Sequence, residues 1–315
     1  MTKEKSTPKQ KITPNLWFDD QAEEAVNFYT SVFENSNIKN TTRYNKEAAA
    51  ASGIPEGTVM TMSFEIEGCS FLALNGGPHF KINPSISFFL NFDPSKNENA
   101  SDNLEEIWNK LAEGGQVLME LGEYPFSPKY GWVQDKYGVS WQLILSNPDG
   151  EDRPKIIPSL MFVGNQAGRA EEAISFYRDI FDDSETGLIA RYEAGQEPDQ
   201  EGTIMFADFK LEDQWFAAMD SAYDHKFGFN EGISFIVHCE DQDEVDYFWN
   251  KLSAMPEAEQ CGWLKDKFGI SWQIIPDALP ELLGNSNTEK AKKAMEAMLQ
   301  MKKIDIEGLK KAAES

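Results

Sequence analysis

The pattern of hydrophobic residues near the N-terminus predicts a short strand followed by an amphipathic helix. Residues 12–18 (ITPNLWF) form a short, mainly apolar segment that reads as a strand. Across residues 21–33 the apolar side chains recur at helical spacing: Ala22, Ala25, Val26, Tyr29, Val32 and Phe33. A second strand is expected to end at residues 43–44, and residues 58–66 and 70–74 alternate as a hairpin turned at Glu67-Gly68. The predicted order is β-α-β-β-β.

The same order recurs in the next stretch of chain. Residues 85–92 read as a strand, and Leu104, Ile107, Trp108 and Leu111 mark a helix that Gly114-Gly115 ends. Strands are predicted near residues 116–121, 132–134 and 140–145. Residues 11–146 therefore hold two β-α-β-β-β units.

Two phrases then return in the same order. Residues 131–142 (GWVQDKYGVSWQ) reappear as residues 262–273 (GWLKDKFGISWQ), and residues 22–29 (AEEAVNFY) reappear as residues 170–177 (AEEAISFY). The two shifts, 131 and 148 residues, are close to each other. A repeat this long in two copies indicates a duplicated domain rather than a solenoid, whose units are shorter and more numerous.

The predicted fold class is therefore α+β with two tandem domains. We expect a disordered tail at residues 1–10, domain 1 at 11–146, a linker at 147–154, domain 2 at 155–283 and a helical extension at 284–315. The second copy is four residues longer before its first helix. It is shortened before its final phrase, because Leu252 and Gly262 are 10 residues apart where Leu111 and Gly131 are 20 apart. We expect the extension to pack across a groove or to form a contact with a partner.

Charge and cysteine content narrow the classes of partner. The chain has 29 basic and 53 acidic residues and a formal net charge of −24, which opposes binding to nucleic acid or to anionic membranes. No apolar run is long enough to span a bilayer, and no secretory signal is expected. Three cysteines, none in a CxxC pair, favour a reducing cytoplasm.

Several motifs carry a resemblance to a known family. They are residues 71–80 (FLALNGGPHF), residues 84–88 (PSISF), the repeated phrase, residues 261–266 (CGWLKD) and residues 297–305 (AMLQMKKID). With paired β-α-β-β-β units, they resemble the PhnB-like branch of the vicinal oxygen chelate superfamily, which includes glyoxalase I, bleomycin-resistance proteins and extradiol dioxygenases. The resemblance implies that the units of each copy curl into a cupped sheet around a small-molecule cavity, and that such domains pair.

This branch often carries the label 3-demethylubiquinone 3-methyltransferase. A typical methyltransferase binds its cofactor at a glycine-rich turn between a strand and a helix. Here Asn75-Gly76-Gly77-Pro78 leads to Pro84 and another strand. Literal methyltransferase activity is therefore not expected.

The resemblance also implies where a metal would bind. Metal-dependent members use His, Glu or Gln from the first, fourth, fifth and eighth strands. Those positions map to Pro14 and Pro158, to Phe71-Leu72 and Trp215-Phe216, to Ser87 and Ser234, and to Gln142 and Gln273. A lone amide cannot hold a divalent ion, so we expect neither metal nor other cofactor.

What remains is a cup of aromatic, hydroxyl and amide side chains. Such a cup suits a small, partly aromatic molecule. Gln142 and Gln273 are expected to face inward, with Trp141 and Trp272 packed under the helices. The candidate ligand-binding residues are Trp17, Asn75, Ser87, Phe89, Trp132, Gln142, Asp220, Ser234, Trp263 and Gln273.

Other hypotheses stay open. One is a lyase or isomerase that uses Asp220, His225 or Cys261 as acid, base or nucleophile. A metal site assembled from His225, His238 and a carboxylate such as Asp220 is a separate and less favoured hypothesis. Another is a degenerate module whose role is self-association through the C-terminal helix, and a homodimer is compatible with every hypothesis.

Overall fold

The computed structural model of the protein describes residues 10–284 and 288–315, without the side chains of residues 47, 51 and 288. Residues 1–9 of the predicted tail lie outside the described residues. Gln10 is described, and its side-chain amide pairs with the backbone of Ser70: Nε2 donates to the carbonyl at 3.1 Å and Oε1 accepts from the N–H at 2.8 Å.

The first copy has the predicted order of elements. Its first unit comprises β1 (Ile12–Phe18), α1 (Ala22–Val32), β2 (Ser36–Arg43), β3 (Val59–Ile66) and β4 (Cys69–Asn75). Its second unit comprises β5 (Ile86–Phe92), α3 (Ala100–Ala112), β6 (Gln116–Tyr124), β7 (Ser127–Gln134) and β8 (Ser140–Leu145). The sequence pattern missed α2 (Lys46–Ser52), which begins at an Asn45 side-chain cap and ends at Gly53 with a φ of +76°.

The second copy repeats this order with one strand missing. It comprises β9 (Ile156–Phe162), α4 (Ala170–Arg178), β10 (Glu185–Arg191), β11 (Ile204–Leu211), β12 (Gln214–Asp220), β13 (Ile233–Cys239), α5 (Gln242–Leu252), β14 (Trp263–Lys265) and β15 (Ser271–Pro276). Short 3-10 turns lie at Gly164–Gln166 and Pro256–Ala258. The second turn replaces the counterpart of β6, at the place where the sequence is ten residues shorter.

The C-terminal extension takes over part of the role of that missing strand. It contains α7 (Thr288–Met298) and α8 (Ile306–Glu314), and it follows α6 (Leu279–Leu283) at the end of copy two. Between α7 and α8, the carbonyls of Met301 and Lys302 accept hydrogen bonds from the N–H groups of Cys261 and Gly262 at 2.8 and 2.7 Å. In copy one the matching residue, Tyr130, pairs with Gly122 of β6. The extension thus satisfies a backbone edge that the deletion left open.

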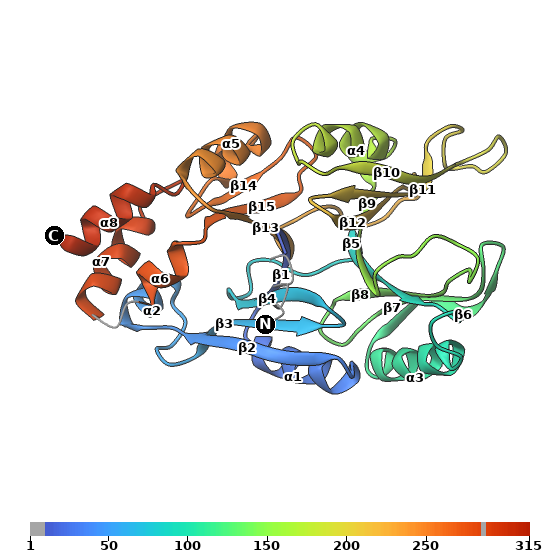
Figure 1. Cartoon of the computed structure of the whole chain (residues 1–315), viewed down its shortest axis with the longest axis horizontal. Coiled ribbons are helices and arrows are strands. Elements are labelled where there is room, and N and C mark those ends of the chain that lie inside the picture. Colours follow the sequence, from blue (N-terminus) through green and yellow to red (C-terminus); the bar gives the residue numbers. More distant parts are fainter. Residues whose placement is uncertain (1–9, 285–287) are drawn as a thin grey trace, which may run out of the picture.

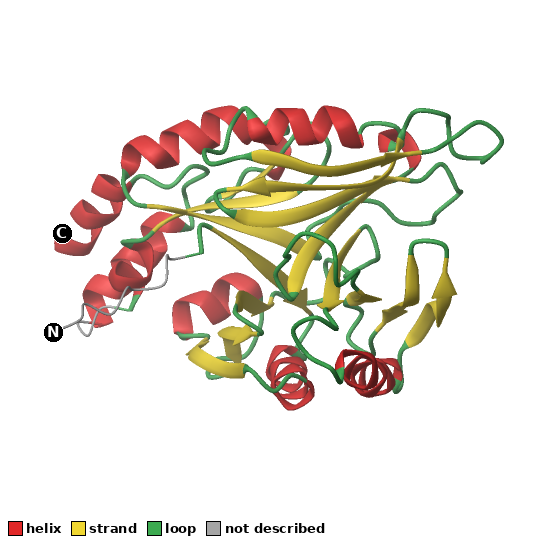
Figure 2. Ribbon diagram, turned by 45° about the vertical axis from the view of Figure 1, so that its right-hand side comes forward, coloured by secondary structure: helices red, strands yellow, loops and turns green. Residues whose placement is uncertain are grey.

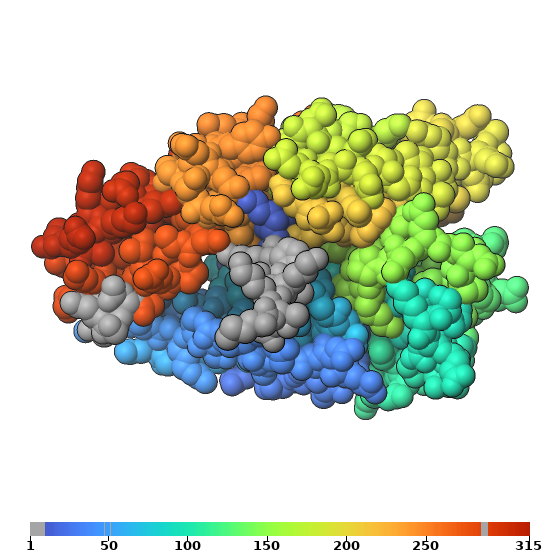
Figure 3. All heavy atoms as spheres, in the orientation of Figure 1, coloured from blue at the N-terminus to red at the C-terminus, as the bar shows by residue number. Residues whose placement is uncertain are grey.

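The strands form two sheets, and each sheet draws on both copies. The seven-stranded sheet has the order β14-β15-β13-β1-β4-β3-β2, and the eight-stranded sheet has the order β10-β11-β12-β9-β5-β8-β7-β6. The antiparallel pairs β1–β13 and β5–β9 join the copies, with Asn15 opposite Ser234 and Ser87 opposite Ser159. The α+β class is confirmed, but a cupped sheet made by each copy alone is not what forms. Figures 1 and 3 show the copies as two layers, blue to green against yellow to red.

One continuous apolar core, with buried residues from both copies, lies on the helix-bearing faces of the sheets. Helices α1 and α5 cover one face of the seven-stranded sheet, and α3 and α4 cover one face of the eight-stranded sheet (Figure 2). Within copy one the rings of Phe71 and Phe88 bridge the two sheets at 5.2 Å, and Phe216 and Phe235 do so in copy two at 5.6 Å. Helix-bearing faces therefore hold each copy together, while strand edges join one copy to the other.

A buried carboxylate links the two repeated phrases. In copy one, Asp135 Oδ2 accepts hydrogen bonds from the Tyr29 hydroxyl at 2.9 Å and from Trp141 Nε1 at 2.8 Å. Its Oδ1 accepts from the N–H groups of Tyr137 and Val139, around a turn that Gly138 permits with a φ of +94°. Burial raises the pKa of Asp135 to about 6.

The second copy repeats this hub atom for atom. Asp266 Oδ2 accepts from the Tyr177 hydroxyl at 2.6 Å and from Trp272 Nε1 at 2.8 Å. Trp141 and Trp272 are each 1% exposed, on the helix-bearing faces of the sheets, as predicted.

Among the residues that the structure describes, no helix combines the length and apolar character needed to cross a bilayer.

The hub yields a stability prediction. Tyr29→Phe deletes a buried hydrogen bond to Asp135 and should lower the free energy of unfolding by about 2 kcal/mol in urea titrations. Tyr137→Phe is the matched control, because it deletes a Tyr–carboxylate bond to Glu24 at the surface and should cost less than about 0.5 kcal/mol. Equal losses in the two variants would show that the hub is not a principal support.

The shared sheets yield a second prediction. Residues 1–146 and 147–315, produced together as separate chains, should elute as one 1:1 complex of nearly the intact size, because each completes the other's sheets. Residues 1–146 produced alone should self-associate, because β1 and β5 then expose unpaired edges. A stable, well-behaved monomer of residues 1–146 in size-exclusion chromatography with light scattering contradicts the shared-sheet arrangement.

Candidate ligand-binding cups

Both sheets curl around the face that carries no helix. In the eight-stranded sheet the rings of Phe89 on β5 and Phe206 on β11 meet at 5.7 Å, although two strands separate β5 from β11. In the seven-stranded sheet Trp17 on β1 and Trp263 on β14 meet at 5.8 Å, again with two strands between them. We call the inner faces the eight-strand cup, which carries Ser87, Gln142 and Ser159, and the seven-strand cup, which carries Asn15, Ser234 and Gln273.

The floor of the eight-strand cup is a chain of polar groups. The Tyr130 hydroxyl donates to Gln142 Oε1 at 2.6 Å, and Gln142 Nε2 donates to Ser87 Oγ at 2.8 Å. All three side chains are buried, and burial raises the pKa of Tyr130, which keeps the phenol protonated as a donor. This chain fixes the amide orientation of Gln142.

Three other polar atoms of this sheet are buried without a partner. Ser140 and Ser159 flank Ser87 in register on the neighbouring strands, and Trp132 lies opposite Gln142 on β7. Ser140 Oγ, Ser159 Oγ and Trp132 Nε1 have no hydrogen-bond partner among the described residues. A buried polar group left unsatisfied costs about 1–3 kcal/mol, so these atoms are the cup's strongest signal of a bound molecule.

Aromatic side chains and one cation form the walls of the eight-strand cup. Phe89, Tyr130 and Ile157 pack there with the half-buried Trp132, Phe206 and Trp215. The Arg153 guanidinium lies 3.7 Å from the centre of the Trp215 ring, and its Nε donates to Asp208 Oδ2 at 2.8 Å. The inner face of this sheet is thus largely apolar with a few placed polar groups, the usual composition of a small-molecule site.

The seven-strand cup is more polar. Ser234 Oγ accepts from Gln273 Nε2 at 3.0 Å and from Asn15 Nδ2 at 3.3 Å, and the buried Asn15 Oδ1 has no partner among the described residues. Trp17 packs edge-on against Phe80 at 5.0 Å and donates its indole N–H to the Gly77 carbonyl at 2.8 Å. Trp17 thus has a partner, in contrast to Trp132.

The structure corrects the position expected on the first strand of each copy. Pro14 and Pro158 do not face the cups; Asn15 and Ser159, their chain neighbours, do. The sequence held the signal, because Trp17 was placed in the cup and side chains two apart share a face of a strand. Asn15 shares that face with Trp17, and Pro14 lies on the other.

Neither cup fits a divalent metal ion. The four ligand positions hold Asn15, Leu72, Ser234 and Gln273 in one cup and Ser159, Ala217, Ser87 and Gln142 in the other. None of these side chains is a carboxylate or an imidazole, and neutral amides with hydroxyls are weak ligands for such ions. Across residues 10–284 and 288–315, no three His, Cys, Asp or Glu side chains are grouped to hold a metal ion.

Two predicted binding residues serve the fold instead. Asp220 Oδ1 accepts from the N–H groups of Gly168 and Ala170 at the start of α4, and Oδ2 accepts from Ile204. Asn75 does the same in copy one, where Oδ1 accepts from Ala22 at the start of α1. Both side chains close a helix N-terminus and are occupied by backbone groups.

Among the residues that the structure describes, the other two catalytic candidates have no partner that would activate them. Cys261 Sγ lies 3.5 Å from the Met298 carbonyl, and burial raises the pKa of the thiol. His225 follows β12 in a loop, where its Nε2 shares a hydrogen bond of 2.9 Å with Ser221 Oγ and burial lowers its pKa. His238 lies on β13 of the other sheet and hydrogen-bonds Thr13 at 3.1 Å, so it forms no site with His225.

Comparison with known proteins identifies the family. A family model described as 3-demethylubiquinone-9 3-methyltransferase matches residues 10–144 and again residues 154–275. The chain belongs to this family. It is a tandem, PhnB-like member of the vicinal oxygen chelate superfamily, and the two matched ranges coincide closely with the two copies.

Several solved structures are similar to parts or most of the chain. The PhnB protein from Bacillus cereus is 40% identical over 44% of this chain and 100% of its own, with a TM-score of 0.38. A protein from Staphylococcus aureus is 33% identical over 45% of this chain and 100% of its own, with a TM-score of 0.18. Glyoxalase I from Zea mays is 12% identical over 76% of this chain and 80% of its own, with a TM-score of 0.44. No curated protein matches the chain.

Proposed function

We propose that this PhnB-like protein binds a small, partly aromatic molecule in its eight-strand cup, without a metal ion. The observation that carries the proposal is a set of three buried polar atoms, on Ser140, Ser159 and Trp132, that have no partner among the described residues and lie in a cup walled by aromatic rings. Trp132 Nε1 is a donor only, so the ligand must present an acceptor to it, such as a carbonyl or hydroxyl oxygen.

The chemistry of the cup favours binding over catalysis. Ser87 and Gln142 occupy positions where metal-dependent members of the superfamily carry ligands, and neither can supply Lewis-acid assistance or general acid–base catalysis near neutral pH. Asp220 is occupied by backbone donors, and the Cys261 thiol is held protonated by burial. The protein would therefore act by sequestering, sensing or carrying its ligand.

The family's methyltransferase label finds no support in the local structure. Gly76 and Gly77 follow β4, but they make room for Trp17: a Cβ on Gly76 would lie 2.2 Å from that ring. No helix begins after this turn, because the next element is β5. The glycines thus serve packing and do not form a cofactor-binding turn between a strand and a helix.

The test measures ligand binding with and without chelator. Acetophenone, 4-hydroxyacetophenone and 1-naphthol are suitable probes, followed by thermal shift and tryptophan fluorescence. We expect at least one to stabilise the protein equally with and without EDTA. Trp132→Phe keeps the ring but deletes the N–H, and should weaken binding about five- to tenfold.

Trp263→Phe is the matched control, because it changes an indole in the other cup and should leave affinity unchanged. Binding that disappears with EDTA and returns with Mn²⁺ or Zn²⁺ would falsify the metal-free proposal. Equal weakening by Trp132→Phe and Trp263→Phe, or no binding of any probe, counts against the eight-strand cup.

A further inference from the structure

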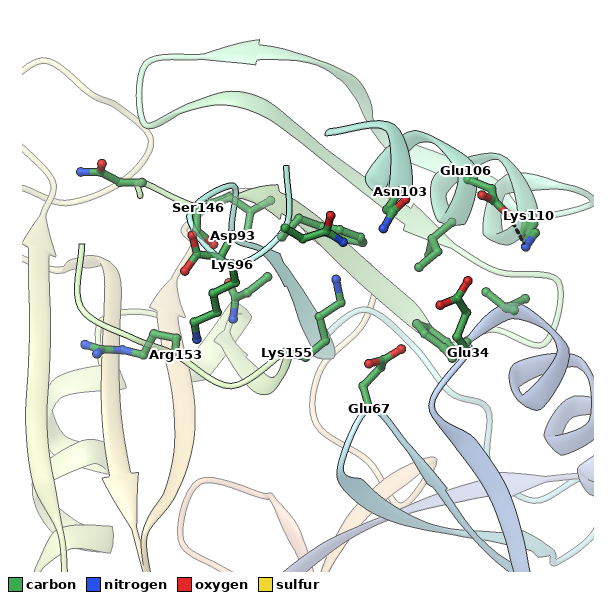
Figure 4. Close-up of a pocket in the computed structure, with 18 of the residues that line it drawn as sticks. Glu34, Glu67, Asp93, Lys96, Asn103, Glu106, Lys110, Ser146, Arg153 and Lys155 are labelled. Atoms are coloured by element: carbon green, nitrogen blue, oxygen red, sulfur yellow. Dashed lines mark hydrogen bonds and ion pairs between the residues drawn. The ribbon is translucent and has the colours of Figure 1, made fainter. Parts of the chain in front are cut away.

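A cavity of about 670 Å³ lies where the first copy meets the linker. Arg153, a wall residue of the eight-strand cup, also lines it, but Ser87, Gln142 and Ser159 do not. Its walls come from the end of α1, the β3–β4 turn, the end of β5, one side of α3, and residues 146–155 (Figure 4). The volume is within the range of about 300–1,000 Å³ seen for small-molecule sites. Phe33, Phe92, Ile107 and Ile144 give it apolar wall surface.

Lys155 places a cation in this cavity that has no anionic partner among the described residues. Its Nζ lies over the Phe92 ring, 3.1 Å from the ring centre, and Figure 4 shows it pointing toward the middle of the cavity. Among the described residues Lys155 forms no ion pair, whereas Lys110 pairs with Glu106 at 2.7 Å and Arg153 with Glu151 at 2.9 Å. Burial lowers the pKa of Lys155 to about 8, because desolvation opposes the charged form.

Two carboxylates face the cavity from the opposite wall. Glu34 follows α1 and Glu67 lies in the β3–β4 turn, and Figure 4 shows both directed toward the space beside Lys155. Neither forms an ion pair among the described residues; Glu67 Oε2 accepts a hydrogen bond from Asn35 Nδ2 at 3.2 Å. The charge of Glu67 acts on Lys155 without a direct contact between them.

A cation and two anions that form no ion pair among the described residues, separated by a space with some apolar wall surface, call for a ligand with both charges. A simple organic anion would meet repulsion from Glu34 and Glu67, and a simple amine would meet repulsion from Lys155. A zwitterion satisfies both sides, with its carboxylate at Lys155 and its ammonium at Glu34 and Glu67. An apolar side group could then lie against Phe33 and Ile107.

We propose that this cavity is a second ligand site, which binds an apolar zwitterion of the α-amino-acid type through Lys155, Glu34 and Glu67. The site shares no residue with the floor of the eight-strand cup, and its occupancy does not depend on the function proposed for that cup. It is bounded by both units of copy one and by the linker, so its ligand would also brace the junction between the copies.

The test uses three probes that differ by one charged group: L-phenylalanine, 2-phenylethylamine and 3-phenylpropanoate. Titration calorimetry on the full chain at pH 8 should show L-phenylalanine binding at least tenfold more tightly than either of the others. Similar affinity for all three, or no binding of L-phenylalanine, overturns the proposal. This comparison needs no variant and is therefore independent of folding defects.

Variants then assign the charges. Lys155→Met and Glu67→Gln should each weaken L-phenylalanine binding about tenfold, and Lys39→Met, which removes a lysine paired with Glu65 outside the cavity, should leave it unchanged. A carboxylate beside Lys155 raises its pKa, so binding at pH 8 should take up protons. The uptake, measured in two buffers of different ionisation enthalpy, should fall in Lys155→Met; an undiminished uptake and affinity in that variant contradict the site.

Discussion

The buried carboxylate hub is the interaction on which the rest of the architecture depends. Asp135 receives hydrogen bonds from α1 of the first unit and from β8 of the second, so it ties the two units of copy one together from the inside. Asp266 does the same in copy two. With the units of a copy fixed by their helix-bearing faces, the opposite faces and the strand edges are left free, and it is those edges that join the copies.

The two cups follow from that division. Each takes its first and fourth ligand positions from one copy and its fifth and eighth from the other, as Ser159 beside Ser87 and Asn15 beside Ser234 show. The floors are built alike, with a glutamine donating to a serine in both. The walls differ, because Arg153, Trp215 and Phe206 line one cup, and Trp17, Phe80 and Trp263 edge the other.

Much of this was visible in the sequence. The period of apolar residues located α1 and β1, and the repeated phrases located both copies and predicted that Trp141 and Trp272 are buried. The sequence did not predict which strand edges pair with one another. The pairing of β5 with β9 is a contact between copies that leaves no periodic trace. Similarly, nothing local distinguishes Asp220 as a helix cap from Asp220 as a catalytic acid; only the three N–H groups around it decide. The inward position of Asn15 was within reach, since it follows from the placement of Trp17.

The crossed sheets also bear on how such a chain can change over time. A protein made of one copy could close a sheet only by meeting an identical second molecule, and both resulting cups would then be the same. Fusing two genes removes that obligation. Each copy can now accept substitutions that the other copy lacks. A substitution on β1, β5, β9 or β13 then changes a cup that is built from strands of both copies. Copy two lacks the strand that copy one has before its Gly-Trp phrase, and the C-terminal extension pairs with the backbone left open there. In a symmetric dimer of identical chains, the same strand would be missing from both subunits.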